Sequence, residues 1–316
     1  MKRVLGLVLV AAIVCVAAVL LLFLGNAFFL AQRADYGWDP EISAPEFIAK
    51  HPRILIDEAH HNASTAGIAG RYWPFARLLR ADGYAVGRNK NAFTRARLDG
   101  VQVLVIANAS GAPKPQVFGM NLPHRTDKKR SEPAFTTAEI EAIRSWVEQG
   151  GSILLIADHA PFGEAAAGLS TALGVTMHKG FVEVPDESSD PLLFSLDNGR
   201  LGDHPIIQGD KPGTAIQRVM TYTGQSLDGP VEATVLLRLP GTAVEAVPEA
   251  DTLTARPAGP AQGLAFERGK GRVVVLGEGA MVTAQVNRRV PYGMNTPDND
   301  NRQFVLNVMH WLSRKL

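Results

Sequence analysis

Residues 135–160 read FTTAEIEAIRSWVEQGGSILLIADHA and carry the clearest structural signal in the chain. Thr136 and Glu139 have the spacing of a helical capping box, in which each side chain satisfies a free backbone N–H of the first turn. Apolar residues then recur at helical spacing, which predicts one buried helix face. The glycines at 150–151 end this helix, and the apolar run at 152–157 predicts a buried strand.

Three other segments show the same near-continuous apolar pattern, which is typical of parallel strands covered on both faces. They are residues 53–56, 101–107 and 273–276. Helical patterns lie between several of them, so strand and helix alternate. This alternation predicts an α/β domain with an open, mainly parallel sheet and helices on both faces. Ligands of such sheets bind beyond the carboxyl ends of the strands.

The chain divides into three parts by composition, and the last of them contains an insertion. We interpret residues 1–30 as a transmembrane signal anchor and residues 31–52 as a linker, because three Xaa-Pro pairs keep the linker backbone extended. Residues 53–316 form the α/β domain. Within it, residues 177–260 are rich in Pro, Gly and Asp and contain only short strand-like pieces, which predicts an irregular insertion.

The N-terminus predicts the compartment. Lys2 and Arg3 precede an uncharged apolar run that ends near Leu30. A bilayer needs about 20 apolar residues, whereas the core of a cleaved signal has about 7–15. The positive residues favour a cytoplasmic N-terminus, so we expect a single-pass protein of the inner (cytoplasmic) membrane with an extracytoplasmic C-terminal domain. Cleavage near Ala27 or Ala31 is the alternative.

Charge and cysteine content exclude several functions. The 316 residues include 32 basic and 31 acidic side chains, so the chain lacks the basic excess of a nucleic-acid-binding protein. Cys15 is the only cysteine and lies inside the apolar run. The exported part therefore has no disulfide, thiol nucleophile or cysteine-ligated metal.

Residues 57–60 read DEAH, the letters of a helicase nucleotide-binding motif. Such an ATPase also needs a phosphate-binding G-x-x-x-x-G-K-[ST] loop. No such loop occurs in the chain, so the motif is coincidental and an ATPase is excluded.

Ionisable and polar side chains follow the expected strands. Because parallel strands end at one edge of a sheet, these groups are expected to share that edge, where they could supply acid/base chemistry or bind a divalent metal. The expected catalytic residues are Asp57, Glu58, His60, Asp158, His159 and Glu278, and the expected ligand-binding residues are His61, Asn62, Asn108 and Ser110.

Two alternatives remain open at this point. Asp and Asn after a strand are also good helix caps and turn formers, so Asp57 and Asp158 could simply hold their own loops. A divalent metal is a possible cofactor, with His60, His61 and His159 as its candidate ligands, although the chain lacks the helical H-E-x-x-H spacing.

Four stretches together resemble an uncharacterised bacterial family with a class I glutamine-amidotransferase-like domain. They are ILIDEAHHN (54–62), FTTAEIEAIRSWVEQGGSILLIADHAPFG (135–163), GKGRVVVLGEGAMVTAQ (269–285) and MNTPDNDNRQFVLNVMHWLS (294–313). The resemblance implies a flavodoxin-like sheet. The broader superfamily includes glutamine amidotransferases, trehalose-utilisation-type proteins and non-catalytic domains of gliding-motility and ciliary-transport proteins.

Glutaminase activity is not implied for this chain. That activity needs a cysteine nucleophile after a strand, and here the strand at 152–157 is followed by Asp158 and His159. We therefore expect an anchored extracytoplasmic protein with a polar Asp/Glu/His site, acting hydrolytically on a small molecule or glycan. The alternative is a non-catalytic ligand-binding or scaffold module of an envelope or transport assembly.

Overall fold

The computed structural model describes residue 14 and residues 32–316, apart from residues 69, 114–115, 118–119, 122–126, 186, 188–190 and 251. Within that part of the chain, no helix is long and apolar enough to cross a membrane. Except for Val14, the anchor expected at residues 1–30 lies outside the described residues.

The helices include the one expected from the capping box. The Thr136 side chain accepts the Glu139 N–H, and the Glu139 side chain accepts the Thr136 N–H, so both halves of the box are present. The described helices are α2 (Trp73–Ala81), α3 (Arg95–Leu98), α4 (Thr137–Glu148), α5 (Phe162–Ala172), α6 (Pro205–Gln208) and α7 (Asn301–Leu312), with a 3-10 turn at Asp127–Lys129.

A nine-stranded sheet forms the centre of the domain. Five neighbouring strands run parallel in the order β3-β2-β4-β7-β17. Counted along the chain, these five stand in the order 2-1-3-4-5, which is the flavodoxin-like order. Their bounds are β2 (Arg53–Asp57), β3 (Ala85–Asn89), β4 (Val103–Ala107), β7 (Ser152–Ile156) and β17 (Gly271–Leu276).

The expectation of a mainly parallel sheet is only partly correct. Beyond β17 the sheet continues through antiparallel strands, namely β16 (Ala261–Arg268), β12 (Leu227–Asp228), β8 (Thr176–Met177) and, beside β16, β13 (Thr234–Arg238). Parallel neighbours need long crossovers, whereas the short turn between β16 and β17 lets these two strands pair antiparallel. The fold is therefore mixed α/β.

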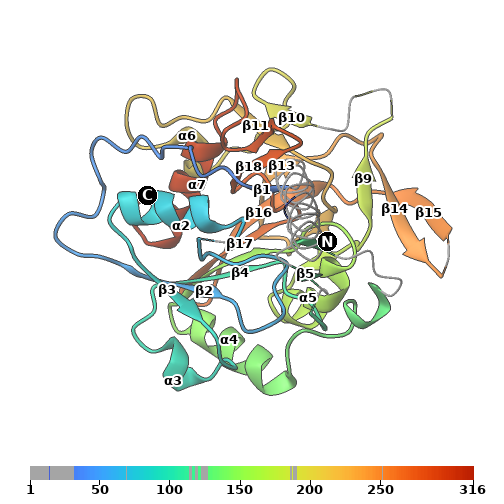
Figure 1. Ribbon diagram of the computed structural model, residues 1–316, viewed down its shortest axis with the longest axis horizontal. Coiled ribbons are helices and arrows are strands. Elements are labelled where there is room, and N and C mark those ends of the chain that lie inside the picture. Colours follow the sequence, from blue (N-terminus) through green and yellow to red (C-terminus); the bar gives the residue numbers. More distant parts are fainter. Residues whose placement is uncertain are drawn as a thin grey trace, which may run out of the picture.

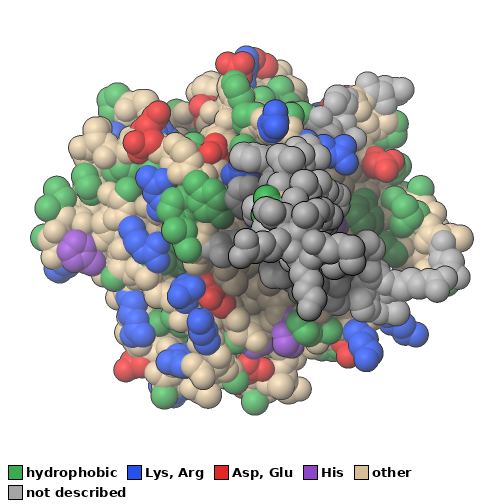
Figure 2. Space-filling view, in the orientation of Figure 1, with side chains coloured by type: hydrophobic (Ala, Val, Ile, Leu, Met, Phe, Trp, Pro, Cys, Tyr) green, Lys and Arg blue, Asp and Glu red, His purple; other side chains and the backbone are tan. Residues whose placement is uncertain are grey.

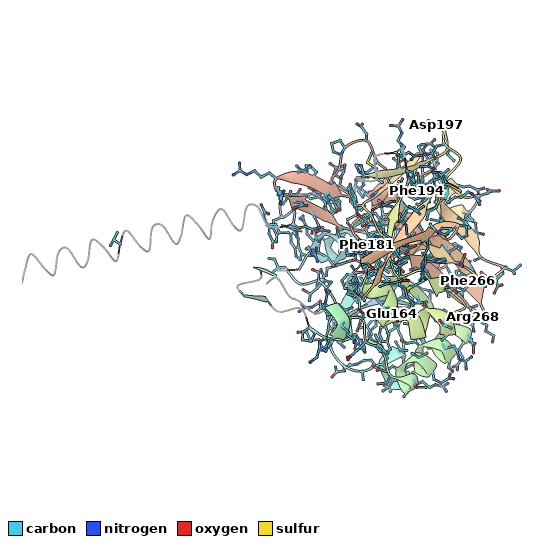
Figure 3. All side chains as sticks on the ribbon, turned by 90° about the vertical axis from the view of Figure 1, so that its right-hand side faces the viewer. Glu164, Phe181, Phe194, Asp197, Phe266 and Arg268 are labelled. Carbon is cyan, nitrogen blue, oxygen red and sulfur yellow. The ribbon has the colours of Figure 1, made fainter. Side chains whose placement is uncertain are left out.

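The segment expected to be irregular, residues 177–260, contains short antiparallel strands joined by stretches without regular secondary structure. Besides β12 and β13, it contains β9 (Phe181–Glu183), β10 (Leu192–Ser195), β11 (Arg218–Thr221), β14 (Val244–Glu249) and β15 (Thr252–Pro257). Phe194 of β10 is fully buried and belongs to the same apolar cluster as the central sheet (Figure 3). This segment therefore packs onto the α/β domain.

The segment expected to be a linker also packs onto the domain from residue 32 onward. Its strand β1 (Arg33–Ala34) pairs with β18 (Ala284–Asn287), which in turn pairs with β19 (Val290–Gly293). The Phe47 ring lies 4.5 Å from the Tyr84 ring, centroid to centroid. A further two-stranded sheet joins β5 (Gln116–Val117) to β6 (Met120–Asn121).

Helices cover both faces of the parallel strands, as expected (Figure 1). Alternate residues of β4 explain its continuous apolar run: Val103 and Val105 pack with α2 and α7, whereas Leu104 and Ile106 pack with α3, α4 and α5 on the opposite face. Because both faces are covered, only the strand ends remain available for a site.

Candidate functional site

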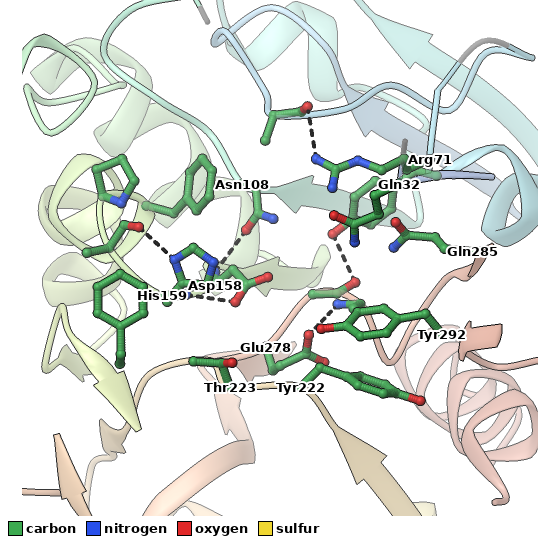
Figure 4. Close-up of a pocket in the computed structure, with 18 of the residues that line it drawn as sticks. Gln32, Arg71, Asn108, Asp158, His159, Tyr222, Thr223, Glu278, Gln285 and Tyr292 are labelled. Atoms are coloured by element: carbon green, nitrogen blue, oxygen red, sulfur yellow. Dashed lines mark hydrogen bonds between the residues drawn. The ribbon is translucent and has the colours of Figure 1, made fainter. Parts of the chain in front are cut away.

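A cavity of about 570 Å³ lies at the carboxyl ends of the parallel strands (Figure 4). Its wall includes residues that follow β2, β4, β7 and β17, namely Ala63, Asn108, Asp158 and Glu278. The volume lies in the range of roughly 300–1,000 Å³ that is common for small-molecule sites. The strand order reverses between β2 and β4, and ligands of open α/β sheets bind at such a switch point.

Two carboxyl groups of the cavity wall interact electrostatically. Glu278 is fully buried, and its two oxygens accept the N–H groups of Ala280 at 2.6 Å and Met281 at 2.8 Å. Burial, and then the charge of Asp158, raise the pKa of Glu278 well above its ordinary value. The Asp158 N–H donates to Asn108 Oδ1 at 2.8 Å, which fixes the position of Asp158.

His159 contributes an imidazole to the same wall. Its Nδ1 atom donates to the Ala160 carbonyl oxygen at 2.7 Å, and its ring stacks on Phe181 with centroids 4.7 Å apart. A carbonyl oxygen can only accept, so the neutral ring carries its proton on Nδ1. Nε2 then holds the free electron pair, and no described residue forms a hydrogen bond with it. This arrangement suits a proton acceptor.

Tyr72 is a site residue that the sequence pattern did not reveal. Its hydroxyl is buried and donates to the Gly279 carbonyl oxygen at 3.2 Å. Burial, followed by the charges of Asp158 and Glu278, raises the pKa of Tyr72. A Cβ atom on Gly279 would lie only 2.7 Å from the Tyr72 hydroxyl, so glycine is needed for this close approach.

Other wall residues come from segments whose sequence gave no sign of a site. They belong to the expected linker, to the loop before α2, to the insertion and to β18 and β19, and no period or motif marks them. They include Gln32, Arg71, Tyr222, Thr223, Gln285 and Tyr292.

The predicted site residues Asp57 and His60 form a cluster with Glu139, and this cluster does not line the cavity. His60 Nδ1 lies 3.0 and 2.9 Å from the two Asp57 oxygens, and His60 Nε2 lies 2.8 Å from Glu139 Oε1. All three side chains are buried. Because both ring nitrogens face carboxylates, both donate, and His60 is an imidazolium. Burial lowers the pKa of His60, but the hydrogen bonds and charges of Asp57 and Glu139 outweigh it and raise the pKa.

Glu139 links this cluster to the first turn of α4. Oε1 also accepts the Phe93 N–H at 3.0 Å, and Oε2 accepts the Thr136 N–H at 3.0 Å and the Thr136 hydroxyl at 2.7 Å. Burial opposes ionisation, but these bonds and the one from His60 lower the pKa of Glu139 to about 2. The cluster therefore fastens the loop after β2 to α4, and its polar atoms are occupied within the fold.

Glu58 and His61 likewise lie away from the cavity wall. Glu58 Oε1 accepts the Ala66 N–H at 2.9 Å, and Glu58 Oε2 lies 3.5 Å from an Arg88 nitrogen. His61 is exposed and has a positive φ of 47°. Both residues belong to the turn that follows β2.

Of the four expected ligand-binding residues, only Asn108 lines the cavity. Asn62 bridges its own loop and β4, accepting the His60 N–H at 3.2 Å and donating to Ala107 O at 2.9 Å. Ser110 is buried and donates to the Ala112 carbonyl oxygen at 3.0 Å. Asn62 and Ser110 therefore hold loops around the site.

The expected metal ligands do not meet in one place. His159 lines the cavity, His60 lies between two carboxylates and His61 is exposed. Among the described side chains, no group of three or more His, Cys, Asp or Glu is placed to hold a metal ion.

Comparisons with known proteins support the fold. No family model matches the chain, and no curated protein matches it in sequence. The structure is similar to the mmIFT52 N-terminal domain, with a TM-score of 0.56, 16% identity and coverage of 82% of this chain and 97% of that one. At this identity the similarity shows the fold alone.

Two further solved structures are similar to a lower degree. A thua-like protein from Bacteroides uniformis has a TM-score of 0.46 and 14% identity, covering 88% of this chain and 95% of its own. A GMP synthase subunit from Thermoplasma acidophilum has a TM-score of 0.42 and 10% identity, covering 84% and 95%. The strand order of the central sheet itself is that of a mixed α/β fold, and it is consistent with the glutamine-amidotransferase-like sheet that the sequence resemblance implied.

Proposed function

We propose that this chain hydrolyses a polar small molecule or glycan, with His159 as general base and the Asp158–Glu278 carboxyl pair as proton donor. The observation that carries the proposal is that an imidazole with a free Nε2 and a carboxyl group of raised pKa line one cavity. General acid/base catalysis needs one group that accepts a proton and another that donates one at the same pH.

The two carboxyl groups of the pair differ in their exposure. Asp158 is half-buried and reaches the cavity, whereas Glu278 is fully buried and its pKa is raised. In the proposed reaction, an attacking water gives a proton to Nε2 of His159, and the leaving group takes a proton from the carboxyl pair. The hydroxyl group and the proton that are added across the broken bond both come from water.

A second candidate function is binding without turnover. It is favoured by the hydrogen bonds of the acids themselves: both Glu278 oxygens and one Asp158 oxygen accept N–H groups of their own loops. Such bonds also fit a rigid binding pocket. The candidates differ in whether a bound compound is cleaved.

The test uses the full chain in detergent micelles and a panel of 4-nitrophenyl glycosides and esters. We expect His159→Ala and Glu278→Gln each to slow hydrolysis about 100-fold or more, because general acid/base groups contribute roughly 10²–10⁴-fold. His178→Ala is the control, since His178 pairs with Asp228 at 2.6 Å outside the cavity. Binding without cleavage would support the second candidate, and hydrolysis that survives His159→Ala would refute the first.

We also propose that the domain lies outside the inner (cytoplasmic) membrane, held by one N-terminal helix. The proposal is supported by the apolar run that follows Lys2 and Arg3. Acidic and basic side chains are interspersed on the visible face in Figure 2, as the near-neutral composition leads one to expect, and we propose no nucleic-acid partner. Fractionation should leave the protein in the membrane pellet, and release without detergent with a new N-terminus near residue 28 or 32 would contradict the anchor.

A further inference from the structure

One cation of the cavity wall has no part in the chemistry proposed above. Arg71 is half-buried and lines the cavity. Its guanidinium makes one long hydrogen bond, 3.5 Å to the Ala63 carbonyl oxygen. No carboxylate among the described residues forms an ion pair with it. By contrast, Arg144 on the surface of α4 pairs with Glu141 at 2.8 Å and with Glu148 at 2.7 Å.

The backbone holds Arg71 in a fixed place beside the site. The Arg71 N–H donates to Ser64 Oγ at 2.6 Å. The next residue, Tyr72, is buried and donates to the carbonyl oxygen of Gly279, which follows Glu278. The Arg71 backbone therefore lies next to a residue that contacts the acid-bearing loop. A partly desolvated guanidinium is stabilised by an anion, and here the open position is the cavity.

Figure 4 shows that Arg71 and the acidic side chains lie on different sides of the cavity. Arg71 and Gln32 lie on one side, and Asp158, His159 and Glu278 lie on the other. A ligand that carried an anionic group at Arg71 would place its remaining part next to the proposed catalytic residues.

The rest of the wall fits a ring that carries hydroxyl groups. Amide side chains of Gln32, Gln285 and Asn108 can exchange hydrogen bonds with hydroxyls, and the half-buried Tyr292 ring, which lies against the buried Tyr222 ring, offers apolar surface. Aromatic surface combined with a few placed polar groups is typical of sites for small organic ligands.

We infer that the cavity takes a sugar with an anionic substituent and that Arg71 binds this substituent. The inference rests on the proposed function of the same cavity and names its substrate class. A planar guanidinium binds a carboxylate or a phosphate through two parallel hydrogen bonds, so either substituent supplies the required pair of anionic oxygens.

The test measures calorimetric binding to the full chain in detergent micelles. Three neutral sugars, D-glucose, D-galactose and D-mannose, are each compared with their uronic acid and 6-phosphate. At least one charged form should bind about tenfold or more tightly than its neutral parent, since hydrogen bonds to charged groups are strong. Arg71→Gln should remove this preference, Arg71→Lys should keep part of it, and Arg80→Gln, an exposed change on α2 outside the cavity, should leave it intact.

Each outcome has a defined meaning. A preference for uronic acids or for phosphates identifies the anionic group. Equal binding of charged and neutral forms, a preference that survives Arg71→Gln, or no binding of any of these sugars would overturn the inference. Charge-selective binding without cleavage of the matching 4-nitrophenyl glycoside would refute hydrolysis alone. Cleavage of charged glycosides at a rate unchanged by Arg71→Gln would refute the inference alone.

Discussion

Two groups of acidic and imidazole side chains follow parallel strands of this sheet, and they serve different purposes. In the group formed by Asp57, His60 and Glu139, both imidazole nitrogens are bonded to carboxylates. In the group formed by Asp158, His159 and Glu278, all three side chains line a cavity, and one imidazole nitrogen has no hydrogen-bond partner in the described chain. The same residue types are therefore bonded to one another within the fold in the first group, whereas in the second group they line a cavity.

The glutamates of the two groups, Glu139 and Glu278, show the same contrast. Glu139 receives hydrogen bonds from Thr136, Phe93 and the His60 cation, and its pKa falls to about 2. Glu278 receives backbone N–H bonds, but burial and the neighbouring Asp158 charge prevail and its pKa rises. Burial raises the pKa of both residues. At Glu139 the hydrogen bonds from Thr136, His60 and Phe93 outweigh burial, whereas at Glu278 the Asp158 charge adds to it.

The largest expected effect comes from removing the imidazolium. His60→Ala leaves the Asp57 and Glu139 carboxylates buried without their cation, and loss of one partner of a buried pair costs about 3–5 kcal/mol. Urea unfolding should show a free energy of unfolding lower by that amount. His61→Ala, at the exposed neighbour, should change it by less than about 0.5 kcal/mol. Similar values for the two variants would mean that His60 is not part of a structural ion pair.

A smaller loss is expected for Glu139→Gln, which keeps the shape but removes the charge. Hydrogen bonds to charged groups contribute about 1.5–3 kcal/mol, so the free energy of unfolding should fall by this order at pH 7. Because the folded pKa of Glu139 is lowered, its stabilisation is present above pH 4.5 and is lost as the pH falls towards about 2. The free energies of unfolding of parent and variant should therefore converge near pH 2. A difference between them that does not change with pH would contradict this prediction.

The opposite pH dependence is expected for Glu278. Its folded pKa is raised, so its stabilisation is complete below pH 4.5 and is lost as the pH rises through the folded pKa. Glu278→Gln cannot ionise, so its stability relative to the parent should increase with pH above 4.5. The raised pKa of His60 adds a similar decline above pH 6.5, which this variant should retain. A parent and a variant with parallel pH profiles would show that Glu278 does not titrate abnormally.

The smallest effect concerns the cap that orients Glu139. Thr136→Ala removes the side chain that accepts the Glu139 N–H, and loss of such a cap costs about 1 kcal/mol. Thr137→Ala, at the exposed first residue of α4, is the matched control and should be close to neutral. The two variants are compared by thermal unfolding. Equal stability would show that the Thr136 cap does not stabilise the protein.

Much of the fold was predictable because its signals are local. The capping box at Thr136 and Glu139 and the apolar strand runs lie within short windows of sequence. The rule that parallel strands end at one edge then placed Asn108, Asp158 and Glu278 around a common cavity. The antiparallel half of the sheet was harder to predict, because its strands are short and pair across long stretches of chain.

The division between the two groups could not be predicted, because it depends on distant contacts. His60 is separated from Glu139 by 79 residues, and Glu139 already had a sufficient local role as a cap. Arg71 and Tyr72 look like the start of a helix, and only the position of Gly279 shows that Tyr72 reaches the site. Residue type and strand-end location are thus insufficient to separate acids that only hold the fold together from acids that line the cavity.

The raised pKa of Glu278 is what distinguishes the cavity group, and it can be measured by a carbon-detected NMR titration of the glutamate carboxyl groups. The Glu278 signal is assigned from its absence in Glu278→Gln. Its midpoint should lie above 4.5 and should move down in Asp158→Asn, because the Asp158 charge contributes to the shift. A Glu278 midpoint at or below 4.5, or one that Asp158→Asn leaves unchanged, would contradict the proposed acid pair.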